Sequence, residues 1–169
     1  MRIAILGTGA IGGVLAGCLS DTNAELVCVS RGTTARDLLE GLTLFTPEGS
    51  VEMIPGERFE IIDSEKGPLQ EEMYGTCDVA VVSGKSGSTP QLASIAEDLI
   101  KQDALVISIQ NGLGNSGIIA SRVGWERVIG GTTTHSAWRD RDGAVHWTGR
   151  GTISIAVSYT HLRAHETYD

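Results

Sequence analysis

The chain has few cysteines, few basic residues and no long apolar run, and each scarcity excludes a class of protein. Its three cysteines, Cys18, Cys28 and Cys77, are odd in number, widely spaced and set among apolar residues. This pattern predicts buried thiols in a reducing compartment, not a disulfide framework or a metal site. Because 13 Lys and Arg stand against 21 Asp and Glu, a nucleic-acid-binding surface is not expected. No apolar stretch reaches the length of a membrane span, so we expect no membrane partner. With the cysteine pattern, this predicts a cytoplasmic protein with no bound metal.

A glycine-rich turn near the start is the most informative feature that the chain does have. Gly7, Gly9 and Gly12 follow an apolar segment with the G-x-G-x-x-G spacing of a dinucleotide-binding strand–turn–helix unit. The first glycine permits the tight turn, the second lets backbone N–H groups approach a pyrophosphate, and the third lets helix and strand pack closely. The positive end of the helix then faces the phosphates. We therefore expect one segment to bind the cofactor: Gly7, Thr8, Gly9, Ala10, Ile11 and Gly12.

The residues after the second expected strand, 25–30, indicate which dinucleotide is bound. NAD-binding domains usually place an acidic residue there for the ribose hydroxyls, whereas the 2′-phosphate of NADP requires a cation. In this chain Arg31 follows the strand, and the next acidic residue is Asp37. A guanidinium offers a planar fork of donors to a phosphate, so the sequence favours NADP(H) as the cofactor. The alternative interpretation is that Arg31 is a solvated surface residue.

The N-terminal segment also has a competing interpretation. Met1 and Arg2, a mostly apolar run and residues 15–18 resemble a bacterial lipoprotein signal with a lipid-accepting cysteine. The run carries several glycines and one positive charge, which is unfavourable for a helical signal, and an apolar strand follows where a polar tether is typical. The cofactor-binding interpretation is therefore favoured.

The rest of the chain alternates apolar strands with helical patterns, which predicts an α/β fold. Buried parallel strands are expected at 2–6, 25–30, 79–83, 105–109 and 127–130, and helices at 10–19, 34–39, 91–100 and 117–123. Between residues 41 and 62 the pattern changes to an inserted hairpin, and 63–73 is expected as a surface connection with a short helix. Two more short strands are expected at 144–148 and 152–156. We therefore predict a Rossmann-type, doubly wound and mostly parallel sheet with an inserted hairpin.

Three polar residues follow expected strands, at the edge of the sheet where ligands bind. Lys85 sits among small residues that would let a ligand approach, and a solvated loop lysine is the alternative. Asn111 precedes a glycine and then a helical pattern, so its amide could reach a nicotinamide or a substrate oxygen; a hairpin turn is the alternative. His135 is a candidate acid or ligand, but a lone histidine without further metal ligands is more often structural.

Together these segments resemble the NADP-binding domain of ketopantoate reductases, over essentially residues 1–156. The resemblance rests on residues 7–12, the pair Ser30 and Arg31, the loop lysine Lys85, and residues 110–114 and 131–135. It implies that the glycine turn and Arg31 bind NADPH. It implies further that Lys85 and Asn111 line the cleft and contact the substrate, and that the main chain at Ala137 touches the cofactor. The implied reaction transfers a hydride from NADPH to the keto carbon of 2-dehydropantoate, on the route to pantothenate and coenzyme A.

The end of the chain departs from this resemblance. Ketopantoate reductases have a second, helical domain with most of the substrate site and a general-acid lysine, and this chain ends before either. Residues 157–169 resemble a translated sequencing adapter, which predicts a non-native tail; a natural polar tail is the alternative. We assign no metal to its His161 and His165, because no third ligand accompanies them.

The expected protein is thus a truncated cofactor domain, inactive alone, of an NADPH-dependent reductase with a small 2-oxo acid substrate. Two other functions stay open at this stage. The parent protein could reduce a different 2-oxo acid, or the chain could be a non-catalytic NADP-binding or interaction module. The sequence does not indicate the oligomeric state.

Overall fold

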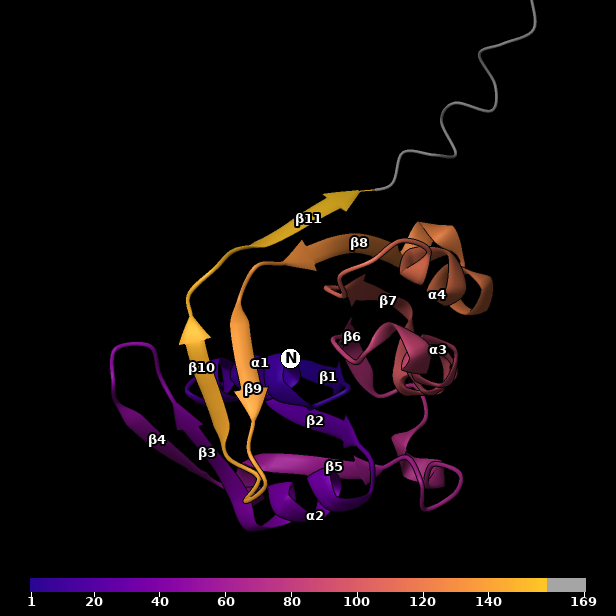
Figure 1. Cartoon of the computed structure of the whole chain (residues 1–169). Coiled ribbons are helices and arrows are strands. Elements are labelled where there is room, and N and C mark those ends of the chain that lie inside the picture. The colour runs from indigo at the N-terminus through magenta and orange to yellow at the C-terminus, as the bar shows by residue number, and fades with distance from the viewer. Residues whose placement is uncertain (158–169) are drawn as a thin grey trace, which may run out of the picture.

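The computed structural model describes residues 1–157, in which two sheets and four α-helices form (Figure 1). The strands are β1 (Arg2–Leu6), β2 (Glu25–Ser30), β3 (Gly41–Phe45), β4 (Val51–Pro55), β5 (Phe59–Asp63), β6 (Cys77–Val82), β7 (Ile100–Ser108), β8 (Val128–Thr133), β9 (Ser136–Arg139), β10 (Val145–Gly149) and β11 (Ile153–Val157). The helices are α1 (Ala10–Ser20), α2 (Gly32–Glu40), α3 (Thr89–Leu99) and α4 (Asn115–Val123), with short 3-10 turns η1 (Gly56–Arg58), η2 (Glu71–Met73), η3 (Ser86–Ser88) and η4 (Trp125–Arg127). None of these helices is long and apolar enough to cross a membrane. The expected tail lies, from residue 158 onward, outside the described residues.

Seven strands form the larger sheet, in the order β11-β8-β7-β6-β1-β2-β5. All of them run parallel except β11, which pairs antiparallel with β8. From β1 the chain order runs outward through β2 and β5 on one side and through β6, β7 and β8 on the other. The strand order therefore reverses between β1 and β6, and doubly wound sheets bind ligands beyond the carboxyl ends of the strands at such a point.

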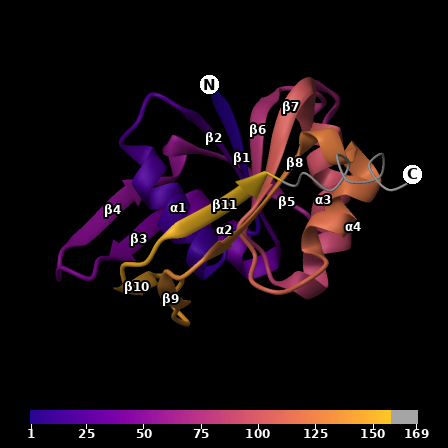
Figure 2. The ribbon, with the colours of Figure 1, turned by 90° about the horizontal axis from the view of Figure 1, so that it is seen from above.

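Helices cover both faces of the larger sheet, because its central strands are apolar on both faces. Figure 2 shows α3 and α4 on one side of this sheet and α1 on the other, with β3 and β4 beyond α1. In β1, Ala4 and Leu6 pack in the apolar cluster that includes α3 and α4, whereas Ile3 and Ile5 pack in the cluster on the α1 side. Successive residues of one strand thus belong to two separate cores.

Helix α1 lies between the two sheets, and its glycines make this packing possible. The smaller sheet has the order β4-β3-β10-β9, and all four of its strands contact α1. A Cβ at Gly13 would come 2.7 Å from Val145 Cγ2, and a Cβ at Gly17 would come 2.6 Å from Leu44 Cδ2. Because these glycines are four residues apart, they share one face of the helix, and that face lets the strands approach closely.

The structure confirms the predicted α/β class, the doubly wound and mostly parallel sheet, and the hairpin, which is β3 paired antiparallel with β4. The sequence does not predict β5, because this edge strand is half-exposed and lacks the continuous apolar run of a buried parallel strand. It does not predict β9 or the smaller sheet either. That sheet depends on pairing of β10 with β3, which lie far apart in the sequence.

The expectation of three buried cysteines is wrong for Cys18. Cys28 and Cys77 are buried in strands of the larger sheet, but Cys18 is exposed. The buried part of α1 ends at Gly17, so Cys18 lies in the last turn of the helix, beyond that part. Burial raises the pKa of the Cys28 thiol to about 12 and also raises the pKa of the Cys77 thiol.

We expect one thiol of the folded chain to react rapidly with a small disulfide reagent. Cys18 is exposed, whereas Cys28 and Cys77 are buried; because burial raises the pKa of all three thiols, access to the reagent is what separates them. Peptide mapping by mass spectrometry should find Cys18 modified first and the other two only after denaturant is added. A Cys18→Ser variant is the control and should have no rapidly reacting thiol. Equal labelling of Cys28 in the native protein would contradict this packing.

Candidate cofactor-binding site

The glycine turn lies where the strand order reverses. Gly7 has a φ of 90°, a backbone conformation that favours glycine. A Cβ at Gly7 would lie 2.4 Å from the Cα of Gly84, which follows β6. The N–H groups of Gly7 and Thr8 donate to the carbonyl oxygen of Val29 in β2, at 2.9 and 3.1 Å. Backbone contacts therefore join the carboxyl ends of β1, β2 and β6 at the point where α1 begins.

A cavity of about 390 Å³ opens at this junction. Its lining residues are Gly7, Thr8, Gly9, Ala10, Ile11, Val29, Ser30, Arg31, Thr34, Ser64, Ser83, Gly84, Lys85, Ser88, Gln91 and Leu92. The cavity brings together three features that the sequence predicts for the cofactor, namely the glycine turn, Arg31 and Lys85. Gly12 does not line the cavity. It packs beneath the turn, where a Cβ would lie 2.4 Å from the carbonyl oxygen of Gly7.

A smaller cavity of about 300 Å³ adjoins the first. Both are lined by Ile11, Ser83, Gly84 and Lys85. The smaller one is also lined by Ser86, Ile109, Gln110, Asn111 and Thr133. Lys85 therefore lies where the two cavities meet. Asn111 lines only the smaller cavity, whereas the end of β2 and Arg31 line only the larger one.

Hydrogen bonds fix the orientation of the Asn111 amide. Its Oδ1 accepts the backbone N–H of Thr133 at 3.3 Å. Its own backbone carbonyl oxygen accepts Ser86 Oγ at 3.2 Å. No hydrogen bond of Asn111 Nδ2 occurs within residues 1–157. The amide NH₂ is thus the donor that Asn111 can offer to a ligand.

Arg31 stands at the other end of the larger cavity, exposed and in an extended conformation before α2. The adjacent Ser30 hydroxyl is buried without a hydrogen-bond partner in the protein. Asp63 Oδ1 accepts the N–H of Gly32, the first residue of α2, at 3.0 Å and the N–H of Glu65 at 3.2 Å. These backbone bonds hold the pKa of Asp63 below its usual value. The guanidinium of Arg31 is the charged side chain that lines the cavity at this end.

Two residues that the sequence singles out line neither cavity. His135 Nδ1 accepts the indole N–H of Trp147 and the backbone N–H of Gly151, each at 3.2 Å. The ring joins the β8–β9 connection to the β10–β11 connection, which supports the structural interpretation of this histidine. Ala137 lies in β9 and packs in the apolar cluster on the α1 side. Its main chain is not among the groups that line the cavities.

Sequence reasoning missed three buried polar residues at the cavities, of which Gln110 lines the smaller cavity and the other two line neither. Thr89, Gln110 and Asn115 are 0 %, 5 % and 4 % exposed, and they hydrogen-bond to one another. The sequence does contain a signal for them. Polar residues at the ends of apolar strands and helices need hydrogen-bond partners when they are buried. Several such residues in two neighbouring loops can be partners of one another.

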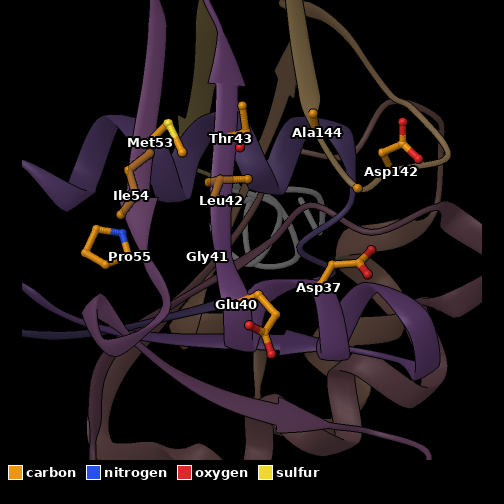
Figure 3. Close-up of a pocket in the computed structure, with 11 residues that line it drawn as sticks. Asp37, Glu40, Gly41, Leu42, Thr43, Met53, Ile54, Pro55, Asp142 and Ala144 are labelled. Carbon is orange, nitrogen blue, oxygen red and sulfur yellow. The ribbon is translucent and has the colours of Figure 1, made fainter.

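A further cavity lies away from the predicted site. It has a volume of about 430 Å³ and lies among α2, β3, β4 and the β9–β10 turn. Figure 3 shows carboxylates of Asp37, Glu40 and Asp142 on one side of it and Met53, Ile54 and Pro55 on the other. Within residues 1–157 no three His, Cys, Asp or Glu side chains come close enough together to hold a metal ion. No residue predicted for the cofactor lines this cavity.

The reversed strand order, the glycine turn and the two adjoining cavities define a dinucleotide-binding domain of the Rossmann type. A family model described as ketopantoate reductase PanE/ApbA matches residues 3–158. The chain belongs to this family.

Relatives and solved structures agree with this assignment. The chain is 32 % identical over 164 residues to a 2-dehydropantoate 2-reductase of Pyrococcus horikoshii, with 93 % of this chain and 48 % of the relative covered. It is 30 % identical over 159 residues to a 2-dehydropantoate 2-reductase of Halobacterium salinarum, with 92 % and 48 % covered. The crystal structure of 2-dehydropantoate 2-reductase from Geobacter metallireducens superposes with a TM-score of 0.73 at 28 % identity, covering 93 % of this chain and 49 % of that one. The chain spans about half the length of the curated relatives it matches.

Two glycine variants should differ in their effect on stability, because Gly7 is tightly packed and Gly9 is not. Gly7→Ala should destabilise the fold by at least about 2 kcal/mol, because it adds a left-handed alanine and an overpacked Cβ. Gly9→Ala is the matched control, since a Cβ at Gly9 has no atom within 4 Å. It should leave the free energy of unfolding within about 0.5 kcal/mol. Denaturant titration of both variants measures the difference, and equal losses of stability would contradict the geometry of the turn.

Proposed function

We propose that this chain is the NADPH-binding part of a reductase that converts 2-dehydropantoate to pantoate, on the route to pantothenate and coenzyme A. Family membership supports the reaction, and the two adjoining cavities support the cofactor. The observation that carries the proposal is that the glycine turn opens onto two adjoining cavities. Arg31 lines the larger cavity and Asn111 lines the smaller one. The chain's free thiols suit a reducing compartment, and we assign the protein to the cytoplasm.

The residues present fit a dinucleotide in three respects. Space is open at Gly9, where the first N–H groups of α1 suit a pyrophosphate. The buried Ser30 hydroxyl lacks a partner, and Arg31 beside it has the charge and geometry for a 2′-phosphate. Lys85 and Asn111 would then lie toward the nicotinamide end.

The chain's own residues would serve to bind and orient the substrate. When bound, NADPH supplies the hydride. Asn111 Nδ2 can donate to the oxygen of the substrate's keto group, because Thr133 holds Oδ1 and leaves the NH₂ free for a ligand. Lys85, at the meeting point of the cavities, can attract the substrate carboxylate. The family resemblance implies a general-acid lysine that protonates the product alkoxide, in the half of its members' length that this chain does not span. We therefore expect the chain alone to be inactive.

A second candidate keeps the fold and changes the substrate. The ternary structure of D-mandelate dehydrogenase with NADH and anilino(oxo)acetate superposes on this chain with a TM-score of 0.77 at 22 % identity, a likeness that shows the fold alone. The same architecture thus occurs in a protein with NADH and a different 2-oxo acid, and binding of both cofactors and of several 2-oxo acids should be compared.

We expect Arg31→Asp to weaken NADPH binding by at least about tenfold, because a charge-assisted contact is replaced by repulsion of the 2′-phosphate. Binding of NADH, which lacks this phosphate, should change much less. Arg36→Asp is the matched control, because Arg36 is exposed one turn further along α2 and does not line the cavity. Calorimetric titration of each variant with each cofactor measures the ratio. Equal losses for NADPH and NADH would remove Arg31 from the phosphate site.

The chain should bind NADPH without oxidising it in the presence of 2-dehydropantoate. The reason is that the general acid is implied for the part of the relatives' length that this chain does not span. Absorbance of the reduced nicotinamide, followed over hours at saturating substrate, measures turnover. A steady fall that depends on both chain and substrate would show that residues 1–169 suffice for the reaction.

A further inference from the structure

A buried series of hydrogen bonds links the two loops that carry Lys85 and Asn111. Gln110 Nε2 donates to the backbone carbonyl oxygen of Gly84 at 2.7 Å and to Thr89 Oγ1 at 2.9 Å. The side chain of Gln110 thereby crosses from the end of β7 to the loop after β6. It also holds the residue directly before Lys85.

Asn115 completes the link from the opposite side. Thr89 Oγ1 donates to Asn115 Oδ1 at 3.1 Å. Asn115 Nδ2 lies 3.3 Å from Ser86 Oγ, 3.4 Å from the carbonyl oxygen of Asn111 and 3.3 Å from that of Gly112. One amide group therefore contacts the residue after Lys85 and the backbone of Asn111 itself.

The donors and acceptors in this series permit only one assignment of which group donates each hydrogen bond. Gln110 can donate only through Nε2, so Thr89 Oγ1 accepts from it and must give its own proton to Asn115 Oδ1. That choice fixes Asn115 Nδ2 as the donor toward Ser86 and the loop carbonyls. Because Thr89, Gln110 and Asn115 are almost wholly buried, water cannot replace a missing partner.

Each loop also has contacts of its own, since Gly84 packs on Gly7 and Ser86 Oγ donates to the carbonyl oxygen of Asn111 at 3.2 Å, but neither loop contains a long regular element. One carries only the single turn η3, and the other contains Gly112 and Gly114, both with positive φ. Glycines leave the backbone free to move unless side chains restrain it. The hydrogen-bond series is the buried restraint that reaches both loops, and two of its members, Ser86 and Gln110, also line the smaller cavity.

We propose that Asn115, acting with Thr89 and Gln110, is a positioning residue that sets Lys85 and Asn111 for the nicotinamide end of the cofactor and for the substrate. This inference rests on the proposed function. It predicts an effect restricted to one end of the site, because Arg31 and the glycine turn are held by other contacts.

The test compares two probes of different length. Asn115→Asp keeps the acceptor for Thr89 and suits a helix N-terminus, but it replaces the NH₂ donor by an oxygen facing two carbonyl oxygens. We expect the Kd for NADPH to rise by about tenfold, with loss of the fluorescence change of bound nicotinamide. The Kd for adenosine 2′,5′-bisphosphate, which lacks the nicotinamide half, should stay within about twofold.

Three further variants make the result decisive. Asn23→Asp applies the same chemical change to an exposed loop residue and should alter neither Kd. Thr89→Val interrupts the series at its middle and should reproduce the Asn115→Asp pattern. Ser86→Ala removes an exposed member, so it reports on the link even if a buried variant fails to fold, and it should weaken NADPH alone.

Each outcome has a separate meaning. Equal weakening of NADPH and adenosine 2′,5′-bisphosphate in folded variants would overturn the positioning role, and so would unchanged NADPH binding and fluorescence. An unaltered chain that binds neither probe would instead overturn the proposed function, and the inference with it.

Discussion

The close approach of two backbones, at Gly7 and Gly84, is the constraint on which the rest of this structure depends. A Cβ at Gly7 would lie 2.4 Å from the Cα of Gly84, so the loops after β1 and β6 touch without side chains between them. Ser83 Oγ strengthens the junction by donating to the carbonyl oxygen of Gly7 at 3.1 Å. Since the strand order reverses at this junction, the start of α1 opens directly onto both cavities. A bulkier residue at Gly7 would push the two loops apart, whereas a Cβ at Gly84 would meet Leu92 Cδ1 of α3 at 2.5 Å.

The packing of α1 extends this constraint to the smaller sheet. Gly12 places the helix against the turn, while Gly13 and Gly17 admit Val145 and Leu44 from the other side. The smaller sheet is thus fixed to the same helix that begins at the site. Through the connection from β8 to β9 it also fixes the strand whose end, at Thr133, holds the amide oxygen of Asn111. The glycine-rich helix is thus connected to the far end of the ligand site through the smaller sheet and the β8–β9 connection.

Charge is distributed unevenly between the site and the rest of the molecule. The chain carries a net charge of −8, yet the two charged side chains that line the larger cavity, Arg31 and Lys85, are both positive. Asp63, which pairs with Ser30 where β2 and β5 end, accepts the backbone N–H groups of Gly32 and Glu65 with Oδ1. An anionic ligand would therefore meet a cation near each end of the cavity, while the acidic surface elsewhere would repel it.

The sequence by itself determined the elements whose chemistry is local. The apolar strands, the helical periods and the glycine spacing predict the parallel sheet, the hairpin and the turn, because each depends on neighbouring residues. The polarity of Arg31, Lys85 and Asn111 after strand ends predicts which residues border the cavities. Only the tertiary structure decided that a second sheet packs on α1 and that β5 is an edge strand. It likewise decided that Cys18 is exposed and that His135 and Ala137 lie outside the two cavities. It also decided that Gln110, Thr89 and Asn115 meet in one buried series. These features depend on contacts between distant segments, and the free energy of such contacts comes from packing and hydrogen-bond partners that no local pattern specifies.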